Sequence, residues 1–427
     1  MQRVTESFCI ENVILLKQQM LNWASQFSIC CFLDSHNYSD KYHKYDCLVA
    51  AGSYKSFSLF QNSFSELDFF YNENSDWIFG HLNYDLKNEI ENLQSIHENR
   101  IGFPEIFLFI PITVLSLKNH TLTIASIEKQ PQLIYDEINN EKIYDDVLSN
   151  TEKIKLHSAL SKKEYIGVIK KIQQHILRGD CYEINYCQEF FAENIVINPL
   201  STYMQLLQIS PTPFSCFYKL DTKYVLCASP ERFLCKVDNK IFSQPIKGTA
   251  PRNKDNILDE VEKNKLQQNK KERSENVMIV DLVRNDLSKI CEEGSVEAEE
   301  LFGIYSFPQV HQMISTIKGK LKKNIPFSEI LRATFPMGSM TGAPKLRAMQ
   351  LIEEYERTKR QLFSGSIGYI SPKKDFDFNV VIRSIFYNAT NQYLNYLVGS
   401  AITFYADAEK EYDECLLKAK AITETLQ

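Results

Sequence analysis

Hydrophobic and polar positions change their period along the chain. Up to about residue 150, short apolar runs alternate with polar turns, a pattern that predicts strands. This part ends in DEINNEKIYDDVLSNTEK, which is rich in charge and Asn and has little apolar periodicity. We therefore expect a linker there, which separates an amino-terminal part, residues 1–150, from a second domain, residues 151–427.

Helical periodicity begins after this linker. Ser161 and Glu164 have the spacing of a capping box, and apolar residues follow at helical intervals up to Gly179. The pattern predicts further helices over residues 257–290 (broken near Arg273), 330–333, 345–356 and 409–426. Apolar runs predict strands at EINYCQEFF, KYVLCASP, SGSIGYIS, FNVVIRSIFY and NYLVGSAITFY. Because helices and strands mix without strict βα alternation, we expect α+β layers and not a doubly wound sheet.

Composition favours a soluble cytoplasmic protein that binds neither nucleic acid nor membrane. The 427 residues carry 54 acidic and 48 basic side chains, a net charge of −6 that disfavours binding to duplexes. The longest apolar stretch, residues 106–117, contains Pro111 and is shorter than the ~20 residues of a membrane helix. Eleven cysteines without any CxxC spacing indicate reduced, buried thiols.

Two pairs of glutamates have the spacing of a shared helix face. Glu272 and Glu275 lie three residues apart in KKERSENVMIVDL, and Glu411 and Glu414 repeat that spacing in KEYDECLLKAK. Carboxylates from two helices can together bind one Mg²⁺ ion, which prefers oxygen ligands and retains several waters. Taken alone, each pair is more often a solvated helix face.

The segment FPMGSMTGAPKLRAM places glycines directly before a predicted helix. Gly338 and Gly342 permit a tight turn, and Lys345 and Arg347 add positive charge to the first helical turn. Free backbone N–H groups at such a helix start favour an anion. The spacing differs from that of a nucleotide P-loop, so a carboxylate fits better than a triphosphate. An ordinary glycine-rich helix start explains the segment equally well.

Three charged residues beside apolar runs are candidates for chemistry. Lys247, in QPIKGTAPR, can be a nucleophile if its surroundings depress the pKa of the amine, although a single loop lysine is more often a surface residue. Glu231, in ASPERF, can act as a general acid or form a structural salt bridge with an arginine. Arg383, in VVIRSIF, can bind a substrate carboxylate or pair with Asp377. Together these residues indicate an anion-binding site that uses magnesium.

The same stretches occur in the same order in one enzyme family. The sequence resembles the chorismate-utilising enzymes, which include anthranilate, isochorismate, salicylate and aminodeoxychorismate synthases. The match covers residues 160–425 and rests on RGDCYEIN, ASPERF, PIKGTAPR, KERSENVMIVDLVRND, FPMGSMTGAPKLRAM, SGSIGYI, VIRS and EYDECLLK. The resemblance implies an α+β unit with two apposed β layers, helices outside, and the active site in the central cleft.

The resemblance also implies a role for each matching residue. In the family, acidic residues hold Mg²⁺ against the ring carboxylate of chorismate. The residues of this sequence that match them are Glu272, Glu275, Glu411 and Glu414. Glu231 matches a general acid for the departing 4-hydroxyl. The matching substrate-binding positions are Thr249, Thr341, Gly342, Ala343, Lys345, Gly368, Tyr369, Arg383, Gly399 and Lys418.

Lys247 distinguishes the branches of the family. Aminodeoxychorismate synthases resemble this sequence at PIKGT, whereas anthranilate synthases usually have alanine in place of the lysine. In the mechanism that this implies, the amine attacks C2 of chorismate, the C4 hydroxyl leaves, and ammonia then attacks C4 and expels the lysine. The resemblance therefore implies the component I activity of the aminodeoxychorismate synthase branch, for 4-aminobenzoate and folate synthesis. A separate glutamine amidotransferase is the implied source of ammonia.

Some positions depart from the family, and other activities stay open. Gln312 stands where related branches have histidine, with His311 beside it, and Gly399 begins GSAI where the family commonly has GGGI. We find no LLES motif of the tryptophan-inhibited anthranilate synthases. The alternatives are anthranilate synthase component I, an isochorismate or salicylate synthase, and a catalytically silent member of the family.

Overall fold

The computed structural model describes residues 2–38, 41–59, 64–142, 153–307 and 310–427. Most of the expected linker therefore lies outside the described residues. Among those described, no helix has both the length and the apolar character needed to cross a membrane. All eleven cysteines are free thiols, and every one except Cys9 is buried, as expected.

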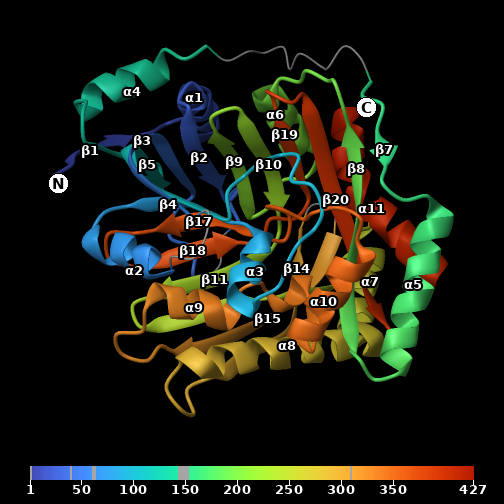
Figure 1. The fold of residues 1–427 in the computed structure, drawn as a ribbon. Helices are drawn as coiled ribbons and strands as arrows, with labels where there is room; N and C mark the ends of the chain where they lie inside the picture. The colour runs from blue at the N-terminus through green and yellow to red at the C-terminus, as the bar shows by residue number, and fades with distance from the viewer. Residues whose placement is uncertain (1, 39–40, 60–63, 143–152, 308–309) are drawn as a thin grey trace.

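The strands form two antiparallel sheets that are joined at one long strand (Figure 1). The pairing order of the first sheet is β1 (Val4–Cys9), β6 (Thr121–Ser126), β5 (Ile106–Lys118), β3 (Cys47–Leu59), β2 (Ile29–Asp34), β9 (Phe214–Leu220), β10 (Lys223–Ser229), β19 (Ser384–Asn388), β20 (Tyr393–Thr403) and β8 (Glu183–Ala192). The short strands β7 (His157–Ser158) and β16 (Gly342–Ala343) also pair with β8.

The second sheet begins where β5 also pairs with β4. Its order is β4 (Ile78–Leu82), β17 (Ser366–Ile370), β18 (Phe376–Asn379), β11 (Arg232–Val237), β12 (Lys240–Gln244) and β15 (Val310–Lys320), with β13 (Ile246–Pro251) and β14 (Glu297–Ser306) also on β15. Strands from before and after residue 150 pair directly, β2 with β9 and β4 with β17.

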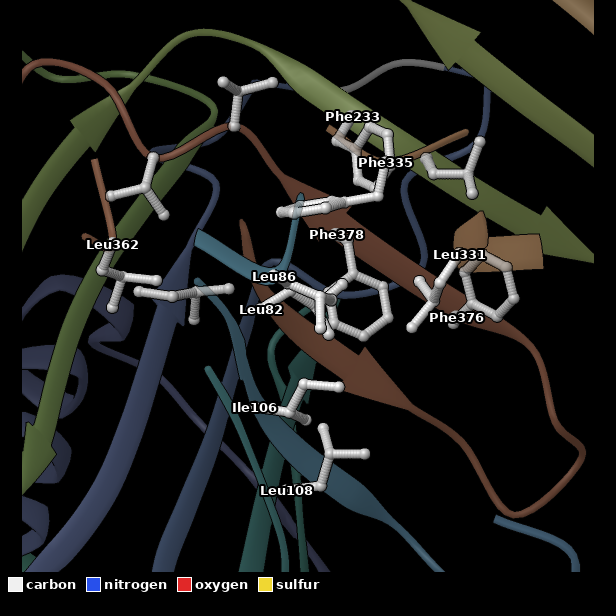
Figure 2. Packing of buried hydrophobic residues seen from close by; sticks show 14 of the residues in the cluster. Leu82, Leu86, Ile106, Leu108, Phe233, Leu331, Phe335, Leu362, Phe376 and Phe378 are labelled. Atoms are coloured by element: carbon white, nitrogen blue, oxygen red, sulfur yellow. The ribbon is translucent and has the colours of Figure 1, made fainter. Parts of the chain in front are cut away.

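Alternating side chains give the first sheet two buried faces. Cys31 and Val225 belong to the apolar cluster that both sheets share, whereas their neighbours Cys30 and Leu226 belong to a cluster with the helices. Successive side chains of a strand point to opposite faces, so one face packs on the second sheet and the other under helices. Figure 2 shows the shared cluster around Phe378, whose neighbours come from β4, β5 and β11.

Helices pack on the outside of these layers. Those that pack in the cluster on the outer face of the first sheet are α1 (Val13–Ser25), α4 (Pro131–Asn139), α5 (Lys162–Leu177), α6 (Pro199–Ile209), α10 (Lys345–Tyr355) and α11 (Ala408–Leu426). Those that pack with the second sheet are α2 (Phe64–Glu73), α7 (Asn256–Gln268), α8 (Lys270–Ile290) and α9 (Phe327–Thr334). The short helices η1 (Tyr84–Leu86), α3 (Lys87–Glu91) and η2 (Gly338–Met340) lie in connections. The expected α+β architecture with two β layers and outer helices is confirmed.

Local signals explain most helix boundaries. Both hydrogen bonds of the predicted capping box are present at the start of α5, between Ser161 and Glu164. The expected break in this helical segment is present but lies before Arg273, at Asn269, which separates α7 from α8 and whose side chain accepts hydrogen bonds from backbone N–H groups in the first turn of α8. The amino-terminal part also contains helices α1, α2 and α4, where the pattern predicted only strands. Asn12 caps α1 in the same manner.

The predicted strand FNVVIRSIFY is interrupted. It forms β18 and β19, with residues 380–383 between them outside any strand. Arg383 has a φ of 51°, in the left-handed region, so the chain turns there. The turn lets the Arg383 side chain reach the wall of the central cavity.

Candidate active site

A cavity of about 1280 Å³ opens between α8, α11 and the ends of β8, β13 and β20. Most of the residues predicted for the site line it, and they come from segments far apart in the sequence. They are Glu231, Lys247, Thr249, Glu272, Glu275, Arg383, Gly399, Glu411, Glu414 and Lys418. The volume suits a small organic substrate.

Lys247 lies in the cavity wall with its amine held by a carboxylate. The register of β13 against β15 shifts between Ile246 and Thr249, and Gly248, with a φ of 92°, occupies this irregularity. The Lys247 side chain is 9% exposed, and its Nζ lies 2.6 Å from Oε1 of Glu183. Burial lowers the pKa of Lys247, but the surrounding carboxylates, chiefly Glu183, outweigh burial and hold the pKa above its ordinary value. The resting lysine is therefore cationic.

Glu231 is a buried acid beside this lysine. It follows β10, where Ser229 donates a hydrogen bond to the Val380 carbonyl and fixes the turn. Burial raises the pKa of Glu231 to about 7, although the Ser339 hydroxyl, which donates to the carboxylate, and the Lys247 cation lower it. A carboxyl group with a pKa near neutrality can hold a proton and give it to a leaving group.

Arg383 is a half-buried cation that faces the cavity. Its guanidinium makes no hydrogen bond or ion pair with the residues that the structure describes, and burial lowers its pKa although Glu231 opposes this. Asp377, the partner considered above, pairs instead with Arg232, at 2.9 Å and 3.0 Å. A half-buried guanidinium without an ion pair can bind an anionic ligand, and its geometry suits a carboxylate.

The four predicted metal ligands come from two helices that face each other across the cavity. Glu272 and Glu275 lie on α8, and Glu411 and Glu414 lie on α11. Burial raises the pKa of Glu275 to about 7 and also raises that of Glu272 and Glu411. Glu414 is different, because Lys418 and other lysines outweigh burial and lower its pKa.

This acidic group has the chemistry of a magnesium site without a closed set of ligands. Its oxygens are hard donors, and Oε1 of Glu275 is buried without a hydrogen-bond partner in the described residues. Lys271 lies between the two helices, with Nζ 3.7 Å from Oε1 of Glu275 and from Oε1 of Glu411. No three acidic, histidine or cysteine side chains of the described ranges converge closely enough to enclose an ion. The carboxylate oxygens are nevertheless of the kind that Mg²⁺ prefers.

Two predicted substrate-binding positions meet at the mouth of the site. The Lys418 Nζ donates a hydrogen bond of 3.1 Å to the Gly399 carbonyl and lies 2.7 Å from Oε1 of Glu414. A Cβ atom at Gly399 would lie 2.3 Å from Sγ of Cys187, so only glycine lets β20 approach β8 this closely.

The glycine-rich block lies behind the cavity wall. Thr341 is fully buried, and its hydroxyl donates to the Met337 carbonyl. Gly342 and Ala343 pair with the first residues of β8. Lys345 forms an ion pair with Asp286 and does not line the cavity. Only Ser339 and Met340 of this block reach the cavity.

Gly368 and Tyr369 lie elsewhere. They line a separate cavity of about 50 Å³ between β2, β9 and β17, together with Asp34 and Lys44. The structure thus brings ten of the predicted residues to the large cavity and leaves six outside it.

The large cavity and its wall also contain residues to which the sequence assigned no role. Gln312 lines the cavity with a buried amide oxygen that has no partner among the residues described, whereas His311 faces away and contacts Ser306 and Asp259. Glu183 and Asn185, which alternate with apolar neighbours on β8, were also overlooked. Strand alternation predicts only that both side chains share one face of the strand.

The fold has a counterpart among solved structures. Anthranilate synthase component I from Streptococcus pneumoniae superposes with a TM-score of 0.77 at 23% identity, covering 90% of this chain and 93% of that one. At this level of identity the likeness defines the fold, and the expected fold class is confirmed.

Sequence comparison then defines the family. Residues 29–424 match the model of the chorismate binding enzyme family, and the chain belongs to that family. Aminodeoxychorismate synthase component 1 from Escherichia coli is 34% identical over 356 residues, which are 82% of this chain and 76% of that protein. The protein of the same name from Klebsiella aerogenes is 39% identical over 268 residues, 63% of this chain and 59% of the relative.

Proposed function

We propose that this chain converts chorismate and ammonia to 4-amino-4-deoxychorismate, the activity named in its relatives from Escherichia coli and Klebsiella aerogenes. The observation that carries the proposal is Lys247, a buried amine in the wall of a cavity that also holds an acid with a pKa of about 7. A nucleophile and a general acid on one cavity are the two groups that a covalent displacement of a hydroxyl needs.

The residues of the cavity take complementary roles in this reaction. Nζ of Lys247 attacks C2 of chorismate, and Glu231 gives its proton to the 4-hydroxyl, which leaves as water. Ammonia then forms a bond to C4 and the lysine leaves C2. Arg383, half-buried and without an ion pair among the described residues, binds a substrate carboxylate, and Thr249, Gly399 and Lys418 line the rest of the substrate site.

Magnesium completes the proposed site. Glu272, Glu275, Glu411 and Glu414 would hold the ion, and its charge would offset that of the ring carboxylate. The number of acids around the cavity supports this assignment, because a dianionic substrate would otherwise be repelled by them.

A glutamine amidotransferase is the proposed partner. The relatives are named as component 1, which implies at least one other component. The described residues contain no disulfide and no exposed cysteine beside the cavity, so the chain offers no thiol there for glutamine hydrolysis.

Product identification by mass spectrometry tests the proposal. The purified chain is incubated with chorismate, Mg²⁺ and ammonium, and then with a glutamine amidotransferase and glutamine. We expect 4-amino-4-deoxychorismate. Anthranilate as the product would instead assign the chain to the tryptophan branch, and the absence of turnover under both conditions would contradict the proposed activity.

A further inference from the structure

The only ion pair of the buried Lys247 amine among the described residues is with Glu183, which lies in the block RGDCYEIN and to which the sequence assigned no role. Glu183 begins β8, and its backbone is paired on both sides, with Ala343 of β16 and Thr403 of β20. Its side chain is 1% exposed and does not line the cavity. Of this ion pair, only Lys247 lines the cavity.

The surroundings of Glu183 are unusual for a structural ion pair. Oε1 lies 2.6 Å from Nζ of Lys247, while Oε2 is buried without a hydrogen-bond partner among the described residues. A purely structural carboxylate in the interior normally has both oxygens satisfied, since an unpaired charged oxygen is costly. Lys247 is thus the only hydrogen-bond partner of this carboxylate among the described residues.

Lys247 needs an acceptor for its proton. The carboxylates that act on it are Glu183 from β8, Glu275 from α8 and Glu231 from the turn between β10 and β11, and together they raise the pKa of the amine. A protonated amine has no lone pair and cannot attack carbon. Of these three acids only Glu183 forms an ion pair with Nζ.

We propose that Glu183 positions Lys247 and takes its proton as the amine attacks the substrate; this inference rests on the proposed function. The proton of Nζ moves to Oε1 of Glu183, and the freed lone pair forms the bond to C2. The two ring double bonds each shift by one position, the C4–O bond breaks, and the hydroxide leaves as water with the proton of Glu231. Charge and atoms balance within the three residues and the substrate.

The pH dependence of adduct formation tests this role. Chorismate and Mg²⁺ are supplied without ammonium, and the rate of mass gain on Lys247 is measured by quenched-flow mass spectrometry from pH 6 to 8 for the wild type and Glu183→Gln. Titration of Glu231 affects both proteins and cancels in the ratio of the two rates. Removing the Glu183 charge also lowers the pKa of Glu275, so Glu275→Gln is combined with each protein to exclude that effect.

We expect the variant to be about 10²-fold slower at pH 7, as for loss of a general base. The ratio of variant to wild-type rate should rise about tenfold per pH unit, because the variant must lose the lysine proton to water. Glu183→Asp should recover part of the rate. Glu189→Gln is the matched control, because Glu189 is a buried acid of the same strand that bonds to Tyr393 and Asn395 away from the cavity.

Equal rates in the wild type and Glu183→Gln, or a deficit that is the same at every pH, would overturn the proposal. The second result would show that Glu183 acts only by packing. If the wild type makes the 4-amino product but never carries mass on Lys247, the covalent function itself is wrong, and the proton transfer from Lys247 fails with it.

Discussion

The hydrogen bond from Ser339 to Glu231 should set the upper pH limit of activity. Glu231 must be protonated to serve as an acid, and its pKa is about 7 because burial outweighs the Ser339 donor and the nearby cations. Ser339→Ala removes a donor that stabilises the carboxylate anion. The anion becomes less stable, so the pKa rises and the protonated form persists to higher pH.

The expected size of the shift follows from the energy of such a bond. A hydrogen bond to a charged group contributes about 1.5–3 kcal/mol, and one pKa unit corresponds to about 1.4 kcal/mol. The alkaline limb of the kcat/KM profile should therefore move upward by about one to two pH units. The kcat/KM profile is the relevant one because it reports the pKa values of groups in the free enzyme.

The assay is the initial rate of product formation at subsaturating chorismate across pH 5.5 to 9.5. Ser243→Ala is the control, because Ser243 is also buried but donates to the Phe233 carbonyl away from the cavity. An alkaline limb that stays in place or moves to lower pH in Ser339→Ala would refute the assignment of that limb to Glu231.

Three further predictions concern the other parts of the site. Glu275→Gln should raise the Mg²⁺ concentration for half-maximal activity by on the order of tenfold, and an unchanged Mg²⁺ titration would remove Glu275 from the metal site. Arg383→Ala should raise KM for chorismate by about 10 to 100-fold, the loss of one charged hydrogen-bonding group, and a change in kcat alone would contradict a role in binding. Gly399→Ala should lower the free energy of unfolding by about 1–3 kcal/mol in urea titrations, because its Cβ would lie 2.3 Å from Sγ of Cys187; full stability would show that β8 and β20 can separate without loss.

Local signals in the sequence predicted local structure well. The capping box at Ser161 formed as expected, and the periodic segment after residue 408 is the helix α11. The pairing of β2 with β9 could not be predicted, since strand partners nearly 200 residues apart leave no local pattern.

The site was predicted less evenly. Lys247 and Glu275 line the cavity and belong to motifs that can be recognised in the sequence without knowing which residues they contact. Lys345 was expected to bind an anionic ligand, but it forms an ion pair with Asp286 of α8. The two residues are 59 positions apart, and no local pattern in the sequence predicts their contact. Glu183 was missed for the same reason, because its partner Lys247 lies 64 residues away.

The central claim is that Lys247 forms a covalent bond to the substrate. It is tested most directly by the intact mass of the protein after brief incubation with chorismate and Mg²⁺ in the absence of ammonium. We expect the mass of the protein to increase by the mass of chorismate less one water, with the added mass on Lys247. Ammonium should release the adduct as 4-amino-4-deoxychorismate, and Lys247→Ala should show no increase in mass. A Lys247→Ala variant that still makes 4-amino-4-deoxychorismate at the wild-type rate would contradict it.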